Sequence, residues 1–223
     1  IKAGVKNIIA VEKDLKCVKI INYQKKLFLN KVILIEGDFL KNHIFKKIVR
    51  EFKKYKKKVV VFSNLPYKTA IPILAKIFRN RNYFQKLILM FQKEQAERIL
   101  AKKNKKNYGR ISVLAQWLCN IEKKMHLSPN YFFPKPKVNS LILEFKFKKK
   151  IKKVNNENLL TELIKKCFNQ RRKTIKNNLK KTINFSDQIL LNCKINPNKR
   201  AQELDFSDFI NLSNSFSKNM KIL

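Results

Sequence analysis

The sequence from residue 58 to residue 67 is Lys58-Val59-Val60-Val61-Phe62-Ser63-Asn64-Leu65-Pro66-Tyr67. Its short β-branched run predicts a buried strand. The Asn-x-Pro-aromatic sequence that follows predicts a stiff turn, because Pro66 fixes its own φ and holds Leu65 extended. Such a turn brings a carboxamide, backbone carbonyls and an aromatic face together, a set that suits a flat base with an exocyclic amine. An ordinary strand-to-loop turn is the alternative that this stretch alone leaves open.

Apolar runs and amphipathic runs alternate on both sides of this stretch. Strands are predicted at residues 7–11, 31–35, 59–62 and 86–91, and helices at residues 15–27, 39–52, 71–78 and 94–100. This alternation predicts an α/β fold with a parallel sheet and right-handed crossovers. Ligands bind beyond the carboxyl ends of the strands in such sheets, where Glu12, Asp38 and Asn64 fall.

The second half of the chain has a different pattern. A helix is predicted at residues 108–117, a stiff loop at 129–136 and an alternating strand at 138–147. The basic run 148–153 marks a boundary, so we expect a catalytic domain at residues 1–150 and a helical domain at residues 151–223. Within 164–179 the spacing predicts one helix face, formed by Ile164, Phe168, Ile175 and Leu179, with Lys165, Arg172 and Lys176 on the other face.

The charge of the chain indicates a polyanionic partner. Its 223 residues carry a formal net charge of +37, from 52 Lys and Arg against 15 Asp and Glu. A field of that size attracts nucleic acid and releases counterions from its phosphates. Compositional drift toward Lys, Asn and Ile is the alternative, so the charge alone supports RNA binding only in part. The spread of basic residues along the whole chain argues against an anionic membrane surface.

Other classes of protein are disfavoured by the composition. The sequence contains no run of about 18 uncharged apolar residues, so no membrane span is predicted, and no signal peptide is visible. The four cysteines form no C-x-x-C pair and no ligand spacing with a histidine, so no metal site is predicted. We interpret them as reduced thiols, mostly small core residues, of a cytoplasmic protein.

A series of short motifs, in order along the chain, resembles one family. The motifs are Val11-Glu12-Lys13-Asp14, Glu36-Gly37-Asp38, Asn64-Leu65-Pro66-Tyr67, Gln92-Lys93-Glu94-Gln95-Ala96-Glu97-Arg98, Tyr108-Gly109-Arg110-Ile111-Ser112, Phe132-Phe133-Pro134-Lys135-Pro136-Lys137-Val138-Asn139-Ser140 and Gln170-Arg171-Arg172-Lys173-Thr174. Together they resemble the bacterial small-subunit (16S) rRNA adenine-N6,N6-dimethyltransferases, whose loss gives kasugamycin resistance. The resemblance implies a Rossmann-like, S-adenosylmethionine-dependent methyltransferase domain with a small all-α C-terminal domain. It also implies dimethylation of two adjacent adenines near the 3′ end of small-subunit rRNA.

The resemblance also implies roles for single residues. Glu12 is expected to accept hydrogen bonds from the ribose hydroxyls of the cofactor, and Asp38 from its adenine amino group. Asn64 is also expected to contact the cofactor. Two acids at successive strand ends, in a chain with so few acids, favour such a site over solvated loop acids. The residues expected to touch the target base are Asn64, Leu65, Pro66, Tyr67 and Phe132. The residues expected to contact RNA phosphates are Arg110 and, on a basic C-terminal helix, Arg171, Arg172, Lys173 and Lys176; a plain solvated helix face is the alternative.

The chemistry of the target amine explains this choice of groups. The lone pair of an adenine amine is delocalised into the ring, so the amine is a poor nucleophile. The side-chain oxygen of Asn64 and the carbonyl of Leu65 or Pro66 can accept from the amine and favour a pyramidal nitrogen. Tyr67 and Phe132 can stack on a flipped base. Positioning then carries most of the rate, and no dedicated general base is needed.

A glycine-rich turn is missing from the pattern. A cofactor site of this class has one about 20 residues before the acidic residue that binds the ribose. With Glu12 in that role the turn precedes Ile1, so we expect an N-terminally incomplete sequence that lacks the first strand and the glycine loop. A decayed gene is the alternative. In either case the chain as given is expected to bind the cofactor weakly or not at all.

Two other functions stay open from the sequence. One is a large-subunit rRNA adenine-N6 methyltransferase of the macrolide-resistance type, against which the 170–174 motif argues. The other is a non-catalytic ribosome assembly or RNA-binding factor, or a transcription-factor relative. The favoured partner is small-subunit rRNA within an immature small ribosomal subunit, bound by a monomer in the cytoplasm.

Overall fold

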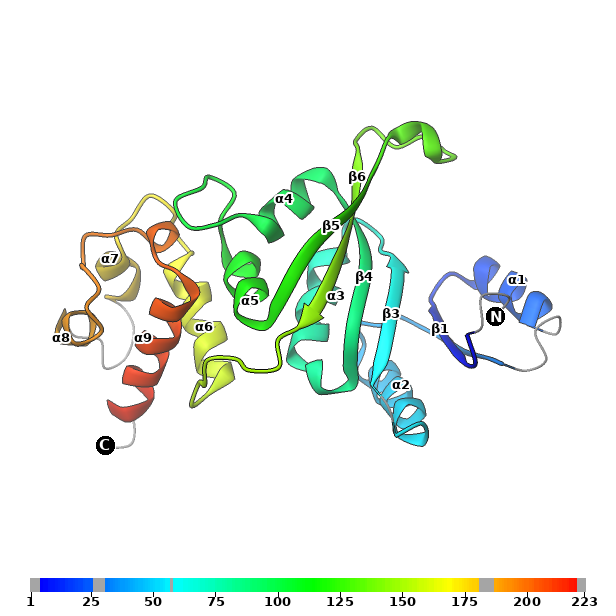
Figure 1. Ribbon diagram of the computed structural model, residues 1–223, viewed down its shortest axis with the longest axis horizontal. Helices are drawn as coiled ribbons and strands as arrows, with labels where there is room; N and C mark the ends of the chain where they lie inside the picture. Colours follow the sequence, from blue (N-terminus) through cyan, green and yellow to red (C-terminus); the bar gives the residue numbers. More distant parts are fainter. Residues whose placement is uncertain (1–4, 26–30, 57, 181–186, 220–223) are drawn as a thin grey trace. The chain divides into compact units, whose positions relative to one another are not determined.

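A computed structural model of the chain describes residues 5–25, 31–56, 58–180 and 187–219 (Figure 1). They form two compact units. The N-terminal unit comprises the residues up to Val61 and Lys68–Lys86, and the C-terminal unit comprises Phe62–Tyr67 and the residues from Leu87 onward. Two strands, β3 (Val59–Asn64) and β4 (Phe84–Gln92), contribute to both units. The predicted boundary at residue 150 stays a prediction.

The N-terminal unit places two strand ends at one edge. β1 (Ile8–Glu12) and β2 (Val32–Glu36) pair in parallel, with Glu12 opposite Glu36. The helices of this unit are α1 (Leu15–Lys25), α2 (Asn42–Lys54) and α3 (Ala70–Arg79), followed by the 3-10 turn η2 (Arg81–Tyr83). α2 buries one apolar face, and the ring of its Phe52 meets that of Phe84 edge-on at 5.6 Å. The segments that follow β1 and β2 therefore leave the sheet side by side.

The C-terminal unit contains most of a four-stranded sheet in the order β3-β4-β6-β5. β5 (Cys119–Leu127) and β6 (Ser140–Phe147) form an antiparallel pair, joined through the 3-10 turn η3 (Pro129–Tyr131) (Figure 1). α4 (Lys93–Leu100) follows β4 directly, and α5 (Arg110–Leu118) leads into β5. The buried rings of Phe91 and Phe145 lie 6.1 Å apart, so β4 and β6 share one core.

The last part of the chain is helical, as predicted. Its elements are α6 (Glu157–Cys167), α7 (Ile175–Leu179), α8 (Asp187–Asn192), the 3-10 turn η4 (Ala201–Glu203) and α9 (Phe206–Asn219). α9 packs against α6 and α8 and buries Phe209 and Phe216. The basic run 148–153 is tied to α5, because the Trp117 indole donates to the Lys152 carbonyl at 2.9 Å.

The structure confirms the four predicted strands, and β1 and β2 pair in parallel as predicted. The four-stranded sheet differs from the prediction, because it contains the antiparallel pair of β5 and β6. β5 was not predicted at all. Its residues from Glu122 to His126 are exposed and mostly charged, so they carry no apolar alternation.

The predicted helix across residues 164–179 is also wrong. Residues 168–174 form a turn between α6 and α7. The side chain of Asn178 holds this turn, accepting from the Gln170 amide at 3.2 Å and donating to the Gln170 and Lys173 carbonyls at 3.1 and 3.3 Å. Thr174 then caps α7, since its hydroxyl accepts from the Asn177 amide. Short polar side chains that bond the backbone compete with a continuous helix in this way.

Candidate active site

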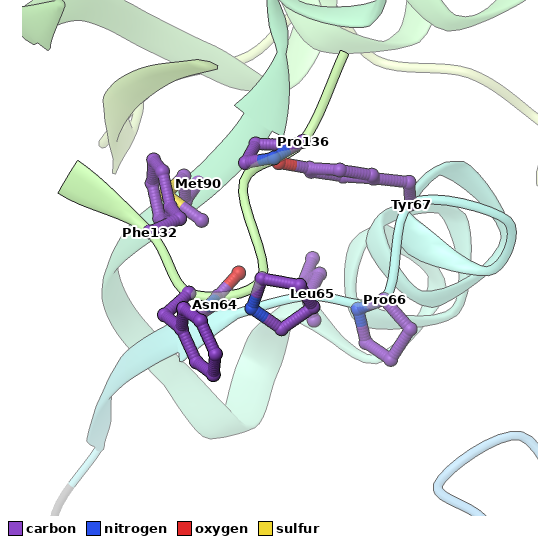
Figure 2. Close-up of a pocket in the computed structure, with 9 residues that line it drawn as sticks. Asn64, Leu65, Pro66, Tyr67, Met90, Phe132 and Pro136 are labelled. Carbon is purple, nitrogen blue, oxygen red and sulfur yellow. The ribbon is translucent and has the colours of Figure 1, made fainter. Parts of the chain in front are cut away.

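A cavity of about 300 Å³ lies at the carboxyl end of β3, within the C-terminal unit (Figure 2). Most of its lining residues are apolar, and Asn64 contributes a polar carboxamide. The lining residues are Asn64, Leu65, Pro66, Tyr67, Met90, Phe132, Phe133, Pro134 and Pro136. All five residues that the sequence assigned to the target base are therefore brought together. A cavity of this size, apolar with few polar groups, suits a small flat ligand.

The turn at residues 64–67 is fixed by contacts from distant parts of the chain. The Tyr67 carbonyl accepts from the Gln95 side-chain nitrogen at 2.8 Å, and the Tyr67 and Ser140 hydroxyls lie 2.9 Å apart. Leu65 is buried, which anchors the turn in the core, while Asn64 stays exposed. Figure 2 shows Asn64, Tyr67, Met90 and Phe132 around the opening. The turn is thus held through Tyr67 and Leu65, and these contacts leave the side-chain carboxamide of Asn64 unused.

The opposite wall is a proline-rich segment between β5 and β6. The Ser128 hydroxyl caps η3 by accepting from the Asn130 amide, and the Phe132 amide donates to the Pro129 carbonyl at 3.2 Å. Phe132 is half-buried, whereas Phe133 is 101% exposed. A second tie joins this segment to α4, since the Lys93 amide donates to the Asn139 carbonyl at 2.9 Å. The stiff wall therefore presents one aromatic ring inside the cavity and one at its rim.

Sequence reasoning missed four contributors to this cavity. Met90 and Phe133 line it, and Gln95 and Ser140 hold its turn. Gln95 and Ser140 belong to motifs that carried the family resemblance, but their contacts join residues 28 and 73 positions apart. No local pattern indicates such pairs. An aromatic directly after Phe132 was visible in the sequence, but not its exposure.

The two predicted cofactor carboxylates lie in the N-terminal unit, at the shared edge of β1 and β2. Glu12 ends β1, and its Oε1 accepts from the Lys13 and Asp14 amides at 2.7 and 2.9 Å. The Gly37 amide donates to the Glu12 carbonyl at 2.7 Å, so the segment that carries Asp38 passes next to Glu12. Both acids are half-buried. One carboxylate oxygen of each is engaged by the local backbone, because Asp38 Oδ1 accepts from the Leu40 amide.

Lys76, which the sequence did not single out, supports this edge. Its ammonium donates to the Leu40 carbonyl at 2.7 Å and lies 4.9 Å from the centre of the Phe45 ring. Burial lowers the pKa of Lys76, and the negative charge of Asp38 opposes that shift. The lysine thereby fixes the turn after Asp38 and adds a positive charge near its carboxylate.

The predicted phosphate-binding residues occupy different settings. Arg110 is exposed at the start of α5, and Arg171, Arg172 and Lys173 lie in the exposed 168–174 turn, not on a helix. Lys176 on α7 pairs with Asp187. The Arg171 guanidinium donates to the carbonyls of Lys106 and Tyr108. Arg171 and Lys176 are therefore engaged within the protein, while Arg172 and Lys173 face solvent.

The other chemical groups show no competing site. The described ranges contain no cluster of three or more His, Cys, Asp or Glu side chains that could hold a metal ion. Within the same ranges, no helix combines the length and apolarity needed to cross a bilayer. Cys119 and Cys167 are buried, and burial raises the pKa of the Cys119 thiol to about 12. Cys17 is exposed, and Cys193 is half-buried.

Comparison with known proteins gives one consistent family. The model of the family described as ribosomal RNA adenine dimethylase matches residues 1–218. The chain is 36% identical over 210 residues to ribosomal RNA small subunit methyltransferase A of Wolbachia pipientis wMel, covering 94% of this chain and 71% of that protein. It is 38% identical over 202 residues to the protein of the same name from Ehrlichia canis (strain Jake), covering 83% of this chain and 77% of that protein.

Solved structures agree with this result. A dimethyladenosine transferase from Plasmodium falciparum is similar with a TM-score of 0.77 and 26% identity, covering 96% of this chain and 83% of that chain. The 23S rRNA methyltransferase ErmE is similar with a TM-score of 0.58 and 15% identity, over 96% of this chain and 83% of that one, which shows the fold alone. The fold is thus the Rossmann-like methyltransferase fold with a helical C-terminal part, and the chain belongs to the ribosomal RNA adenine dimethylase family.

Proposed function

We propose that this protein dimethylates the N6 amines of two adjacent adenines near the 3′ end of small-subunit rRNA, with S-adenosylmethionine as methyl donor. The observation that carries this proposal is the cavity at residues 64–67, which sets an exposed carboxamide between aromatic walls. The names of the relatives, ribosomal RNA small subunit methyltransferase A, support the choice of substrate. The net charge of +37 supports a binding partner rich in phosphates, such as an immature small subunit in the cytoplasm.

The residues of the cavity would act mainly by positioning. A base flipped out of its helix can enter between Tyr67 and Phe132, and stacking of this kind contributes about 1–3 kcal/mol per base. The Asn64 oxygen and a turn carbonyl can then accept from the two N–H groups of the target amine. These bonds favour a pyramidal nitrogen whose lone pair attacks a methyl carbon in line with its leaving group. The amine proton is lost to water after transfer, so no side chain needs to act as base.

The N-terminal unit offers groups that fit the cofactor. Glu12 and Asp38 are half-buried carboxylates at neighbouring strand ends, and hydroxyl and amino groups are the donors that such oxygens accept. Glu12 would hold the ribose diol through Oε2, since Oε1 is engaged by the Lys13 and Asp14 amides. Asp38 would hold the adenine amino group. When bound, S-adenosylmethionine supplies an electrophilic methyl group on a sulfonium leaving group.

Product mapping tests this proposal. The complete protein is purified and incubated with radiolabelled S-adenosylmethionine and either small subunits that lack adenine dimethylation or naked large-subunit rRNA. We expect label only in small-subunit rRNA, as N6,N6-dimethyladenine at two adjacent positions near the 3′ end. Label confined to large-subunit rRNA would indicate the macrolide-resistance reaction instead. Tight binding of small subunits without any transfer would indicate a non-catalytic assembly factor. Either result would overturn the proposal.

A further inference from the structure

A short lysine-rich loop connects α4 to α5 in the C-terminal unit. Residues 102–107 read Lys-Lys-Asn-Lys-Lys-Asn, and all six are exposed. Among the described residues, Lys103 alone of these lysines has an ion-pair partner, Asp205 at 3.5 Å. Four like charges within five residues repel one another, so holding them in one place costs free energy.

Several contacts hold this loop in one conformation. The Asn104 amide donates to the Gln202 carbonyl at 2.8 Å, and Asn104 itself takes a positive φ of 69°. The Lys105 amide donates to the Lys102 carbonyl at 3.2 Å, which closes a turn. At the end of the loop, Nη2 of Arg171 donates to the Lys106 carbonyl at 2.5 Å and to the Tyr108 carbonyl at 3.2 Å.

The use of Arg171 in this tether is informative. A guanidinium brought against a loop of four lysines adds a fifth positive charge to the same place, which costs free energy in the absence of an anion. Both bonds come from the one nitrogen Nη2, at the end of a side chain that is longer than that of lysine. The tether also places the loop beside the next residues of the turn, Arg172 and Lys173, which are both exposed. A polyanion bound across the two segments would remove the repulsion.

From this geometry we infer that the loop at residues 102–106 and the turn residues Arg172 and Lys173 form one composite surface for RNA phosphates. Arg171 is its positioning residue, acting on the loop through backbone carbonyls and not on RNA directly. The inference rests on the proposed function for the identity of the polyanion. The contacts are to the sugar–phosphate backbone, so they set the register of the RNA and carry no base sequence.

Charge neutralisation in the loop tests the surface. The variant Lys102→Gln/Lys105→Gln/Lys106→Gln is compared with the matched variant Lys149→Gln/Lys150→Gln/Lys152→Gln, which removes three exposed lysines from the basic run of the same unit. The dissociation constant for a fragment of the 3′ region of small-subunit rRNA is measured from about 0.05 to 0.5 M salt. Each lost phosphate contact lowers the log–log salt slope by about 0.7–0.9, so the loop variant should lose about 2–3 in slope. Equal slopes for the two variants would overturn the inference.

A second pair of variants tests the role of Arg171. Arg171→Lys keeps the charge but loses the two-carbonyl tether, whereas Arg172→Lys keeps both charge and tether. We expect Arg171→Lys to weaken RNA binding about as much as the loop variant does, and to speed hydrogen exchange at the Asn104 and Tyr108 amides. Arg172→Lys should leave the exchange unchanged. Faster exchange with unaltered RNA affinity would show a merely structural tether, and unaltered exchange with weaker binding would make Arg171 a direct phosphate contact; either contradicts the inference.

The two proposals fail in different ways. The loop variant should still transfer methyl groups at saturating RNA, because its lysines lie outside the cavity at residues 64–67. If the unaltered protein binds RNA with the expected salt slopes but transfers no methyl group, the surface stands and the proposed function falls. If it transfers methyl groups and the loop variant matches its control, the function stands and the surface falls.

Discussion

The cavity at residues 64–67 (the base cavity) and the edge of β1 and β2 that carries Glu12 and Asp38 (the carboxylate edge) are held by side-chain contacts that differ in sequence separation. Tyr67 in the cavity is held by Gln95 and Ser140, which lie 28 and 73 residues away in the sequence. Glu12 and Asp38 are held by backbone amides one or two residues away. The side chain of Tyr67 is therefore held by tertiary contacts, whereas the two carboxylates accept from their own turns, and Lys76 braces the backbone of the turn after Asp38. Damage to one region should leave the other working.

The largest expected effect concerns the side-chain carboxamide of Asn64 in the base cavity. Asn64→Ala should lower the rate constant of methyl transfer about 10²–10³-fold, the size of effect expected when one preorganised hydrogen-bonding group is removed. RNA affinity should change little, because phosphate contacts dominate it. The check is a single-turnover rate at saturating RNA and cofactor, with the dissociation constant of the RNA measured in parallel. Transfer at the rate of the unaltered protein would remove Asn64 from the reaction.

The next effect concerns the turn of the carboxylate edge. Gly37 has a φ of +140°, and a Cβ there would lie 2.3 Å from Cδ1 of Ile44. Gly37→Ala should lower the free energy of unfolding by about 1–3 kcal/mol and weaken cofactor binding. Denaturant unfolding and calorimetric titration with S-adenosylmethionine measure the two changes.

Gly109→Ala is the control for that substitution. Gly109 has extended backbone, and the nearest atom to its added Cβ is Nη1 of Arg171 at 3.9 Å. Its loss of stability should be smaller, with no change in cofactor affinity. Equal losses in the two variants would mean that the conformation of Gly37 does not position the edge.

The smallest expected effect concerns the hydroxyl pair behind the cavity. Tyr67→Phe and Ser140→Ala should each slow transfer modestly, and the double variant should be no worse than either one. The coupling energy in the cycle should be about 0.5–1.5 kcal/mol, as for one hydrogen bond. Purely additive losses would show that the two hydroxyls act separately, and would assign the Tyr67 hydroxyl another role.

What the sequence predicted, and what it missed, follows the same division. Strand ends at Glu12 and Asn64 were predictable, because apolar runs and a proline leave local signals. β5 was not, since its exposed charged residues lack the alternation of a half-buried strand. The break between α6 and α7 was hidden as well: Ile164 and Ile175 are both buried, as one helix face predicts, but from two helices.

Side-chain contacts across the fold were beyond sequence reasoning for a related reason. Arg171 is predicted to contact RNA phosphates, and its guanidinium also donates to the Lys106 and Tyr108 carbonyls, which no local pattern indicates. A basic side chain in an exposed motif looks the same in sequence whether it meets a phosphate or a carbonyl. Only the folded path of the 102–107 loop distinguishes the two.

The most direct test of the division between the two regions uses 2-aminopurine at the first target adenine of a small-subunit rRNA fragment. Its emission is recorded without cofactor, free and bound to the unaltered protein, to Glu12→Gln and to Tyr67→Ala. A base that enters the cavity leaves the stack of its neighbours, so the emission should change equally with the unaltered protein and with Glu12→Gln, and much less with Tyr67→Ala. An unchanged emission with the unaltered protein, or an equal loss of signal in both variants, would contradict a cavity that receives the base on its own.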